Sequence, residues 1–353
     1  MTASTPAIVL GGTGYVAGEL LRLIAGHPAL DVAAILSDSQ PGASVAAAFP
    51  HLASAYPQLS FADLDAIDAL IRKAPRSALF SAAPHGVAAA LIDRLLSAAA
   101  QAGTDVRCVD ISADFRYSSA AAYEAVYRHA HGAPARIREF TCAVPEHLQK
   151  SPTPHVAHPG CFATATLLAI VPLLALGLTD ARLFVTGITG STGSGRKPVE
   201  GTHHPLRHGD LYSYGALSHR HVPEIIACAK LATGVECELN FVPHSGPFAR
   251  GIHVTVQASL KKPLGTPQAI EALKSYYQNS RFVRVTEAAP RVKDVATSNY
   301  ANLSAVTNGN SIAVMSVVDN LNKGAAGGAI QWMNRLLGIS ESTGLTAAAP
   351  GWT

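Results

Sequence analysis

The sequence has few charges, no paired cysteines and no long apolar run. Charged residues make up only 14% of its 353 residues, and Lys plus Arg total 27 against 24 for Asp plus Glu. Since this near balance contains no basic block, we exclude an extended nucleic-acid-binding surface. The five cysteines are scattered and contain no CxxC pair. This spacing argues against both a structural zinc site and a disulfide framework.

The longest apolar run, residues 162–178, falls short of the roughly 20 residues of a membrane span and contains Pro172 and Gly177. It predicts a buried helix instead. The start of the chain has no basic region and leads directly into a glycine turn, so we interpret it as a first strand and not as a signal peptide. We expect a protein of the cytoplasm, with two domains for a chain of this length.

The first half of the chain alternates between strand-like and helix-like segments. Strands are predicted at 7–10, 32–36, 77–82 and 106–111, and helices at 15–25, 63–73 and 87–100. Such alternation favours a parallel sheet with helices on both faces, which binds ligands at the carboxyl ends of its strands. The second half differs, with helices predicted at 162–176 and 324–337, strands at 183–189, 240–242, 251–259 and 312–318, and a polar, histidine-rich loop at 202–221.

The first chemical signal is a glycine turn between a strand and a helix. Gly11, Gly14 and Gly18 follow the spacing GxxGxxAG, a variant of the dinucleotide fingerprint in which Ala17 replaces the usual third glycine. The helix start offers free N–H groups to a pyrophosphate. The alternative is a turn kept only for helix–sheet packing.

At the end of the second strand, the serines of Ser37-Asp38-Ser39 favour NADP and the acid favours NAD, so spacing alone leaves the choice open.

The second signal is Cys161, which follows a Pro-Gly turn and opens a predicted helix. A helix N-terminus lowers the pKa of a thiol and so favours a nucleophile. The alternative is a buried structural cysteine, our interpretation of the other four, Cys108, Cys142, Cys228 and Cys237.

The third signal is His219-Arg220-His221, just before a helix start at Pro223. A histidine there could move protons and the arginine could hold an anion. A solvated surface loop is the plain alternative. A metal held together with His203, His204 and His208 is a further one, although no acidic or thiol ligands complete a recognisable site, and we predict none.

Together these segments resemble the N-acetyl-gamma-glutamyl-phosphate reductases, within the aspartate-semialdehyde-type dehydrogenases. The likeness runs from Val9 to about Gly344. It is carried by segments 11–15, 84–86, 110–116, 158–164, 193–196, 219–225, 243–251 and 319–326. It implies an α/β fold in which a Rossmann-type, doubly wound parallel sheet (1–157 and 319–353) binds the dinucleotide. A second α+β domain (158–318) would serve catalysis and oligomerisation, as a homodimer or homotetramer. The C-terminal helix would return to the first domain.

The resemblance also implies NADPH-dependent reduction of N-acetylglutamyl 5-phosphate to the semialdehyde through a thioester on Cys161, in arginine biosynthesis. We expect His221 as the acid–base group, with His219 as second choice and Glu224 beside them. The expected cofactor-binding residues are Gly11, Thr13, Gly14, Tyr15, Val16, Ser37, Ser39, Pro84, Ser191, Gly193 and Asn320. The expected substrate-binding residues are Ser112, Arg116, Arg220 and Arg250.

Other functions remain open at this stage. Segment 142–146, where the family has Tyr-Gly-Leu-Pro-Glu, and segment 203–205 look like the reductases of lysine synthesis that act on carrier-protein-linked aminoadipyl or glutamyl phosphates. A Cys–His hydrolase would leave the glycine turn unused. A non-catalytic dinucleotide sensor would leave Cys161 unexplained.

Overall fold

The structure is a computed structural model that describes residues 4–37 and 39–352. It divides into two units. The first unit extends to Cys142 and also contains Lys150–His158 and Ala329–Leu345. The second unit contains Ala143–Gln149, Pro159–Gly328 and the segment that begins at Thr346. No helix among the described residues is long and apolar enough to cross a membrane.

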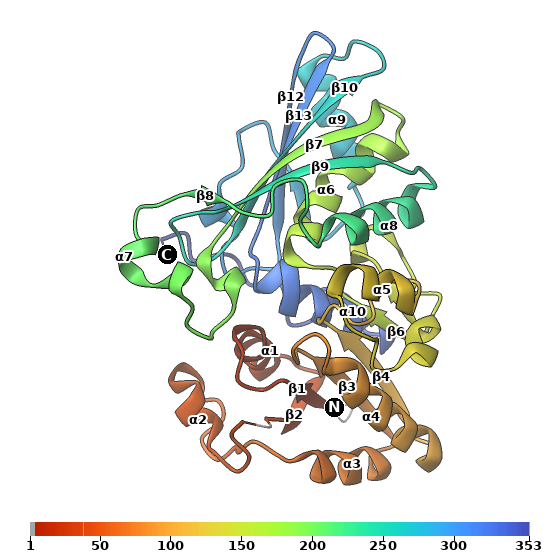
Figure 1. Cartoon of the computed structure of the whole chain (residues 1–353), viewed down its shortest axis with the longest axis vertical. Helices are drawn as coiled ribbons and strands as arrows, with labels where there is room; N and C mark the ends of the chain where they lie inside the picture. Colours follow the sequence, from red (N-terminus) through yellow and green to blue (C-terminus); the bar gives the residue numbers. More distant parts are fainter. Residues whose placement is uncertain (1–3, 38, 353) are drawn as a thin grey trace. The chain divides into compact units, whose positions relative to one another are not determined.

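The first unit is built on a parallel sheet with the strand order β2-β1-β3-β4-β6-β5 (Figure 1). Its strands are β1 (Thr5–Leu10), β2 (Leu30–Ile35), β3 (Arg76–Ser81), β4 (Asp105–Asp110), β5 (Phe140–Cys142) and β6 (His155–Ala157). Its helices are α1 (Tyr15–Ala25), α2 (Val45–Ala48), α3 (Leu64–Lys73), α4 (Ala88–Ala102) and α5 (Ala120–Tyr127). Helix α1 lies over one face of the sheet, and α3 and α4 lie over the other. The predicted parallel, doubly wound fold is confirmed.

The glycine turn lies where the order of strands in this sheet reverses. From β1 the chain builds β2 on one side, and then crosses over to place β3 on the other side of β1. Ligands of such sheets bind at this switch point, at the carboxyl ends of the strands. The turn that follows Leu10 therefore has the position expected of a nucleotide-binding loop.

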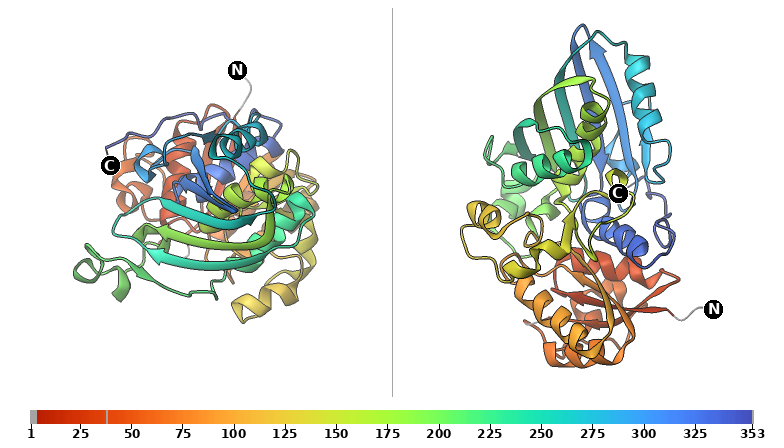
Figure 2. Two further views of the ribbon diagram at one scale, coloured as in Figure 1. Left: turned by 90° about the horizontal axis from the view of Figure 1, so that it is seen from above. Right: turned by 90° about the vertical axis from the view of Figure 1, so that its right-hand side faces the viewer.

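The second unit is built on a mixed sheet with the strand order β11-β12-β13-β10-β7-β9-β8 (Figure 2). Its strands are β7 (Thr179–Thr189), β8 (Tyr212–Ser213), β9 (Glu238–Ser245), β10 (Ile252–Leu260), β11 (Val283–Val285), β12 (Ala301–Asn308) and β13 (Ser311–Val318). Its helices are α6 (Cys161–Ala175), α7 (His204–Arg207), α8 (Val222–Thr233) and α9 (Thr266–Tyr276). Helix α6 packs on β7, β10, β13 and α8, and α9 packs on β11 and β12.

Helix α6 is apolar on all sides and buried along nearly its whole length, as expected of a helix in the centre of a core. Pro172 lies inside it and has no N–H, so the carbonyl of Leu168 loses its helical donor. The hydroxyl of Tyr277 donates to that carbonyl at 2.7 Å. The same hydroxyl lies 2.9 Å from Nε2 of His147. The proline is thus accommodated by a side chain from outside the helix.

One face of the second sheet carries exposed apolar side chains. Phe184 pairs with Gln257, which pairs with Ala313, which pairs with Val306, so these four residues form a row on one face. Residues directly opposite each other in a sheet point to the same side. Phe184 is 49% exposed and Val306 is 48% exposed.

The end of the chain differs from the predicted single helix at 324–337. A π-helical turn at Asn322–Ala326 comes first, and α10 (Gly327–Leu336) follows it. A π-turn widens the backbone by one residue, which apolar periodicity does not reveal. The predicted loop at 202–221 also contains the short elements α7 and β8.

We expect the first unit to lose stability in acid through His155, on β6. Burial lowers the pKa of His155 from 6.5 to about 4, and its Nδ1 accepts a hydrogen bond from the N–H of Cys108 at 3.2 Å. The unfolded chain therefore takes up a proton near pH 6.5 and the folded chain does not. Stability is lost as the pH falls from 6.5 towards 4, by about 2 kcal/mol at pH 5.

The variant His155→Asn keeps an acceptor atom but does not titrate. In urea unfolding at pH 7 and pH 5, the difference in unfolding free energy should therefore shrink by about 2 kcal/mol relative to the wild type. An undiminished difference would show that other groups cause the acid sensitivity.

Candidate active site

Cys161 lies at the first position of α6, directly after the turn that follows β6. The residue before it, Gly160, caps the helix with an extended backbone (φ −60°, ψ 158°) and makes no side-chain cap hydrogen bond. Its own N–H donates to Oε1 of Glu224 at 2.7 Å. The thiol thus stands at the positive end of a buried helix, with its turn tied to a carboxylate of α8.

A cavity of about 420 Å³ opens beside Cys161 within the second unit. The predicted residues His219, Arg220 and His221 line it together with the thiol, and so does Gly193. The remaining lining residues are Phe162, Thr189, Ser194, Tyr214, Gly215 and Ser218. The structure therefore brings together the nucleophile, the two histidines and one arginine that the sequence singled out. Four of these groups can perform nucleophilic and acid–base chemistry or bind an anion.

His219 lies among aromatic rings, and its imidazole is uncharged. It meets Phe162, Tyr214 and Phe241 edge to face, with centroid distances of 5.4–5.9 Å. Burial, with the charge of Arg220 second, lowers the pKa of His219 to about 4. Its Nδ1 accepts the N–H of His221 at 3.3 Å, which places the proton of the neutral ring on Nε2. His219 is therefore suited to donate a hydrogen bond without carrying charge.

His221 is the more buried of the two, with 8% of its surface exposed, and lies against the turn before the thiol. A Cβ atom at Gly160 would stand 2.6 Å from its Nε2 and 2.9 Å from Oε1 of Glu224. Only glycine fits at such distances. The imidazole, the Glu224 carboxylate and the backbone of the turn therefore form one packed cluster, and Glu224 is fully buried within it.

Tyr214 was missed by the sequence reasoning. It lines the cavity, and its ring meets that of His219 edge to face at 5.6 Å. Burial, with the proximity of Cys161 second, raises the pKa of its hydroxyl to about 12. It thus keeps its proton at neutral pH as a donor. Its one sequence signal is its place in the polar loop five residues before His219.

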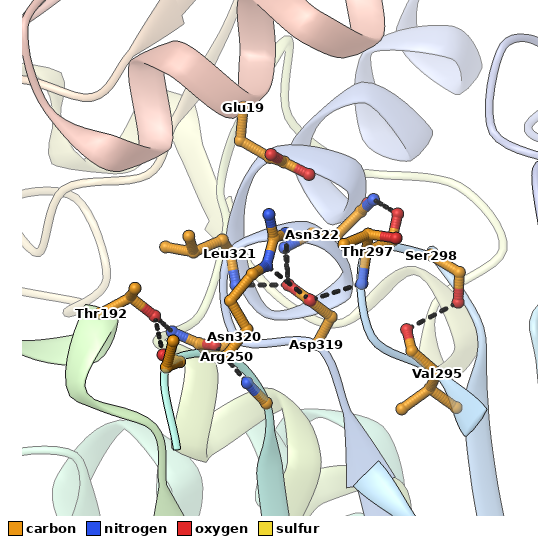
Figure 3. Close-up of polar contacts among 12 residues, drawn as sticks. Glu19, Thr192, Arg250, Val295, Thr297, Ser298, Asp319, Asn320, Leu321 and Asn322 are labelled. Atoms are coloured by element: carbon orange, nitrogen blue, oxygen red, sulfur yellow. Dashed lines mark hydrogen bonds and ion pairs between the residues drawn. The ribbon is translucent and has the colours of Figure 1, made fainter. Parts of the chain in front are cut away.

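Of the expected anion-binding arginines, Arg220 alone lines the cavity, and it is exposed. Arg250 instead makes a bidentate ion pair with the buried carboxylate of Asp319, in which Nε and Nη2 each donate to a carboxylate oxygen at 2.9 Å (Figure 3). In the first unit, Arg116 donates to the carbonyls of Ile111 and His158 at 2.7 and 3.0 Å. The geometry favours Arg220 for substrate and structural roles for Arg250 and Arg116.

Ser112 is also part of a buried network of the first unit. Its hydroxyl donates to Oδ2 of Asp110 at 2.8 Å and accepts the N–H of Asp114 at 3.2 Å. Asp110 is fully buried, and burial raises its pKa to about 6. This network shapes the loop after β4.

Two residues expected to bind the cofactor lie near Arg250 in the second unit. The side chain of Asn320 accepts the N–H of Gly251 at 2.7 Å and donates to Oγ1 of Thr192 at 3.0 Å (Figure 3). The backbone N–H of Ser191 donates to the carbonyl of Phe248 at 2.9 Å. The contacts of Thr192 and Ser191 hold the loop after β7, which carries Gly193 to the cavity.

The glycine turn fits a pyrophosphate. Gly11 has a φ of +80°, and a Cβ atom there would lie 2.5 Å from the backbone of Ala82 and Ala83. Gly14 caps α1 without a side chain, and a Cβ there would have no neighbour closer than 4.0 Å. The space in front of the helix start is thus open to a ligand.

The other expected cofactor residues of the first unit fall at the ends of the strands. Thr13, Tyr15 and Val16 stand at the start of α1, and Pro84 follows β3. Beyond β2, the hydroxyls of Ser37 and Ser39 lie 3.3 Å apart. Asp38, which bears on the choice between NAD and NADP, lies outside the described residues.

Within residues 4–37 and 39–352, no cluster of three or more His, Cys, Asp or Glu side chains could hold a metal ion. The rings of His204, the first residue of α7, and His208, the residue after its end, lie 5.1 Å apart.

Comparison with known proteins gives matches over the whole chain. Residues 6–148 match the family model of the semialdehyde dehydrogenase NAD binding domain, and residues 161–320 match that of the semialdehyde dehydrogenase dimerisation domain. The first match supports a nicotinamide cofactor for this chain. Among solved structures, aspartate semialdehyde dehydrogenase II from Vibrio cholerae has a TM-score of 0.68 at 16% identity, covering 95% of this chain and 98% of its own. A Candida albicans aspartate semialdehyde dehydrogenase with NADP has a TM-score of 0.67 at 14% identity, covering 97% and 100%.

Curated relatives are more similar in sequence. Proteins named N-acetyl-gamma-glutamyl-phosphate reductase are 38% identical in Ectopseudomonas mendocina and 39% identical in Azotobacter vinelandii, each covering 97% of this chain and 98% of its own length. The resemblance drawn from the sequence motifs is confirmed. The chain belongs to the N-acetyl-gamma-glutamyl-phosphate reductase family of semialdehyde dehydrogenases.

Proposed function

We propose that this protein reduces N-acetyl-L-glutamyl 5-phosphate to N-acetyl-L-glutamate 5-semialdehyde and phosphate, with NADPH, in arginine biosynthesis. The observation that carries the proposal is the cavity that Cys161 shares with His219, Arg220 and His221. The names of the 38–39% identical relatives support the same substrate. A hydrolase without cofactor leaves unexplained the open helix start at Gly14 and the match to an NAD binding domain.

In the first half-reaction, the Cys161 thiolate attacks the acyl carbon. The new bond joins sulfur to carbon, the carbon–oxygen bond to phosphate breaks, and phosphate leaves with the electron pair. Backbone N–H groups at the start of α6 would stabilise the oxyanion, because the positive end of the helix dipole lies there. Arg220 is placed to hold an anionic group of the substrate.

In the second half-reaction, a nicotinamide cofactor would supply the hydride that reduces the thioester. His221 donates a proton to the resulting alkoxide, which gives a thiohemiacetal. The hydroxyl then returns this proton to His221 as the carbon–sulfur bond breaks, which releases the semialdehyde and the Cys161 thiolate. In the reverse direction, His221 accepts the proton. Glu224 keeps the imidazole and the thiol turn in register through its bond to Gly160. Covalent catalysis thus replaces one difficult step by two easier ones.

We further propose that the cofactor is NADP(H). The helix start at Gly14 would hold the pyrophosphate, and the hydroxyls of Ser37 and Ser39 would face the ribose phosphate. Hydroxyl groups donate hydrogen bonds to a phosphate without adding negative charge.

The test of the function is the reverse reaction of the purified protein. N-acetylglutamate semialdehyde with inorganic phosphate should reduce NADP, which is followed by the absorbance of the reduced nicotinamide, and aspartate semialdehyde should be a poor substrate. Parallel assays with NAD decide the cofactor. If phosphate is not required, or if the free semialdehyde is inert, the proposed reaction is wrong.

We also propose a homodimer, or a homotetramer built from it, formed through the exposed row on the second sheet. The match of residues 161–320 to a dimerisation domain supports this. Phe184 and Val306 are each about half exposed, and burying their apolar surface in an interface would contribute roughly 25 cal/mol of stabilising free energy per Å² removed from water.

The variant Phe184→Glu should dissociate the oligomer, because a buried carboxylate without a partner is costly. Light scattering after size exclusion should show a smaller particle. The control Leu231→Glu changes another exposed apolar residue, 54% exposed on α8, and should leave the mass unchanged. If Phe184→Glu has the mass of the wild type, this face is not the interface.

A further inference from the structure

The second unit contains a fully buried ion pair outside the cavity. Nζ of Lys323 lies 2.5 Å from Oε1 of Glu146, and the two side chains are 0% and 2% exposed. The ammonium also lies 5.5 Å from the centroid of the Phe282 ring. Removing two charges from water costs several kcal/mol for each ion, so such a pair adds little net stability. Its presence calls for another reason.

Lys323 belongs to the π-helical turn Asn322–Ala326, which packs on the start of α6. A Cβ atom at Gly324 would lie 2.8 Å from Cβ and 3.0 Å from Cα of Cys161. The backbone of the turn therefore touches the residue that carries the thiol. A displacement of the turn would be felt directly at Cys161, since close-packed neighbours cannot move independently.

The turn is fixed at its start by Asp319. The carbonyl of this residue accepts the N–H of Gly324 at 2.9 Å, and its carboxylate accepts those of Leu321 and Asn322 at 2.9 and 2.8 Å. Figure 3 shows the carboxylate between these groups and Arg250. The start of the turn is thus held by Asp319, which is itself bound by Arg250, while Lys323 ties the turn to Glu146.

Glu146, the partner of Lys323, is tied to the same helix from another side. It lies in the short 3₁₀ turn Pro145–His147. Nε2 of the next residue, His147, lies 2.9 Å from the hydroxyl of Tyr277, which donates to the carbonyl of Leu168 in α6. The ion pair therefore connects a turn anchored on the middle of α6 with a turn that touches its first residue.

We propose that the Lys323–Glu146 pair is a positioning device for the thiol, which holds the π-turn against Cys161 and so sets the thiol at the mouth of the cavity. The proposal rests on the function of Cys161 as nucleophile. The pair acts through Gly324 and touches no reacting atom. Misplacement of a reacting group by about 1 Å costs about 100-fold in rate, so the pair acts on kcat and on thiol reactivity more than on substrate affinity.

The test is the double variant Lys323→Met/Glu146→Gln, which removes both charges with little change in shape and leaves no lone buried charge. Three quantities are measured: kcat and KM in the phosphate-dependent assay, the melting temperature, and the pH profile of Cys161 alkylation by iodoacetamide, followed by peptide mass spectrometry. The matched control is Lys230→Met/Glu236→Gln, an exposed ion pair of the same unit at 2.8 Å.

We expect the buried double variant to fold, to lose about 100-fold in kcat at a KM within about threefold of the wild type, and to alkylate with a changed rate or pH midpoint. The exposed control should match the wild type in every respect. Unchanged kcat and alkylation in the folded variant would overturn the proposal. Failure to fold would assign the pair to stability and overturn it as well.

The alkylation readout also separates this proposal from the proposed function. If the wild type itself reduces no acyl phosphate, the function is wrong. The comparison of alkylation profiles between the variant and the wild type still decides whether the pair positions the thiol.

Discussion

The variant Cys161→Ser should lose turnover by a factor on the order of 10⁴ or more while it keeps its cofactor. A serine hydroxyl at the start of α6 fills the place of the thiol but remains protonated at neutral pH, so it cannot form the acyl intermediate at a useful rate. The glycine turn after β1 belongs to the first unit and is untouched by the change. NADPH should therefore raise the melting temperature of the variant as it does for the wild type.

The control is Cys237→Ser, which changes a buried thiol of the same unit directly before β9. Burial raises the pKa of Cys237, which keeps it protonated and unreactive. Its replacement should leave kcat within about twofold. A burst of phosphate equal to one per protein chain, seen when acyl phosphate is mixed with wild type in the absence of NADPH, should vanish in Cys161→Ser. If Cys161→Ser retains phosphate-dependent oxidation of the semialdehyde, the covalent scheme is wrong.

The parts of the molecule that could be predicted are those in which one short segment carries its own reason. The glycine turn is such a case, because both requirements are local. Gly11 has a positive φ, and Gly14 caps α1 without a side chain. Cys161 is another, since Pro159 and Gly160 set the helix start locally. Both positions were found from the order of residues alone.

The parts that could not be predicted depend on partners far apart in the sequence. Nothing in the sequence around Arg250 indicates its ion pair with Asp319, 69 residues later. Nothing local marks Lys323 and Glu146 as a pair, because 177 residues separate them. Strand β12 escaped notice because its short apolar run ends in polar residues. Its place is set by pairing with β13 along its whole length.

The variant His221→Asn should lower kcat by about 10²–10⁴-fold, the usual contribution of a positioned acid–base group. His221 is chosen over its neighbour because it packs with Glu224 on Gly160, the residue that precedes the thiol. Asparagine keeps the backbone N–H that donates to His219, so that contact should survive. The variant should bind NADPH normally, so the loss should appear in kcat and not in the KM for NADPH.

The matched variant His219→Asn tests the alternative order. Because burial lowers the pKa of His219 to about 4, it stays neutral over the assay range and cannot act as a base that is protonated near pH 7. The amide oxygen of the asparagine in this variant can still accept the N–H of His221 in place of Nδ1. We therefore expect a loss of about tenfold, as for one hydrogen bond of about 1–1.5 kcal/mol. If His219→Asn is instead the more damaging of the two, the assignment is reversed. The acid–base group is then the ring that faces Phe162 and Tyr214, and His221 serves only to support the turn beneath the thiol.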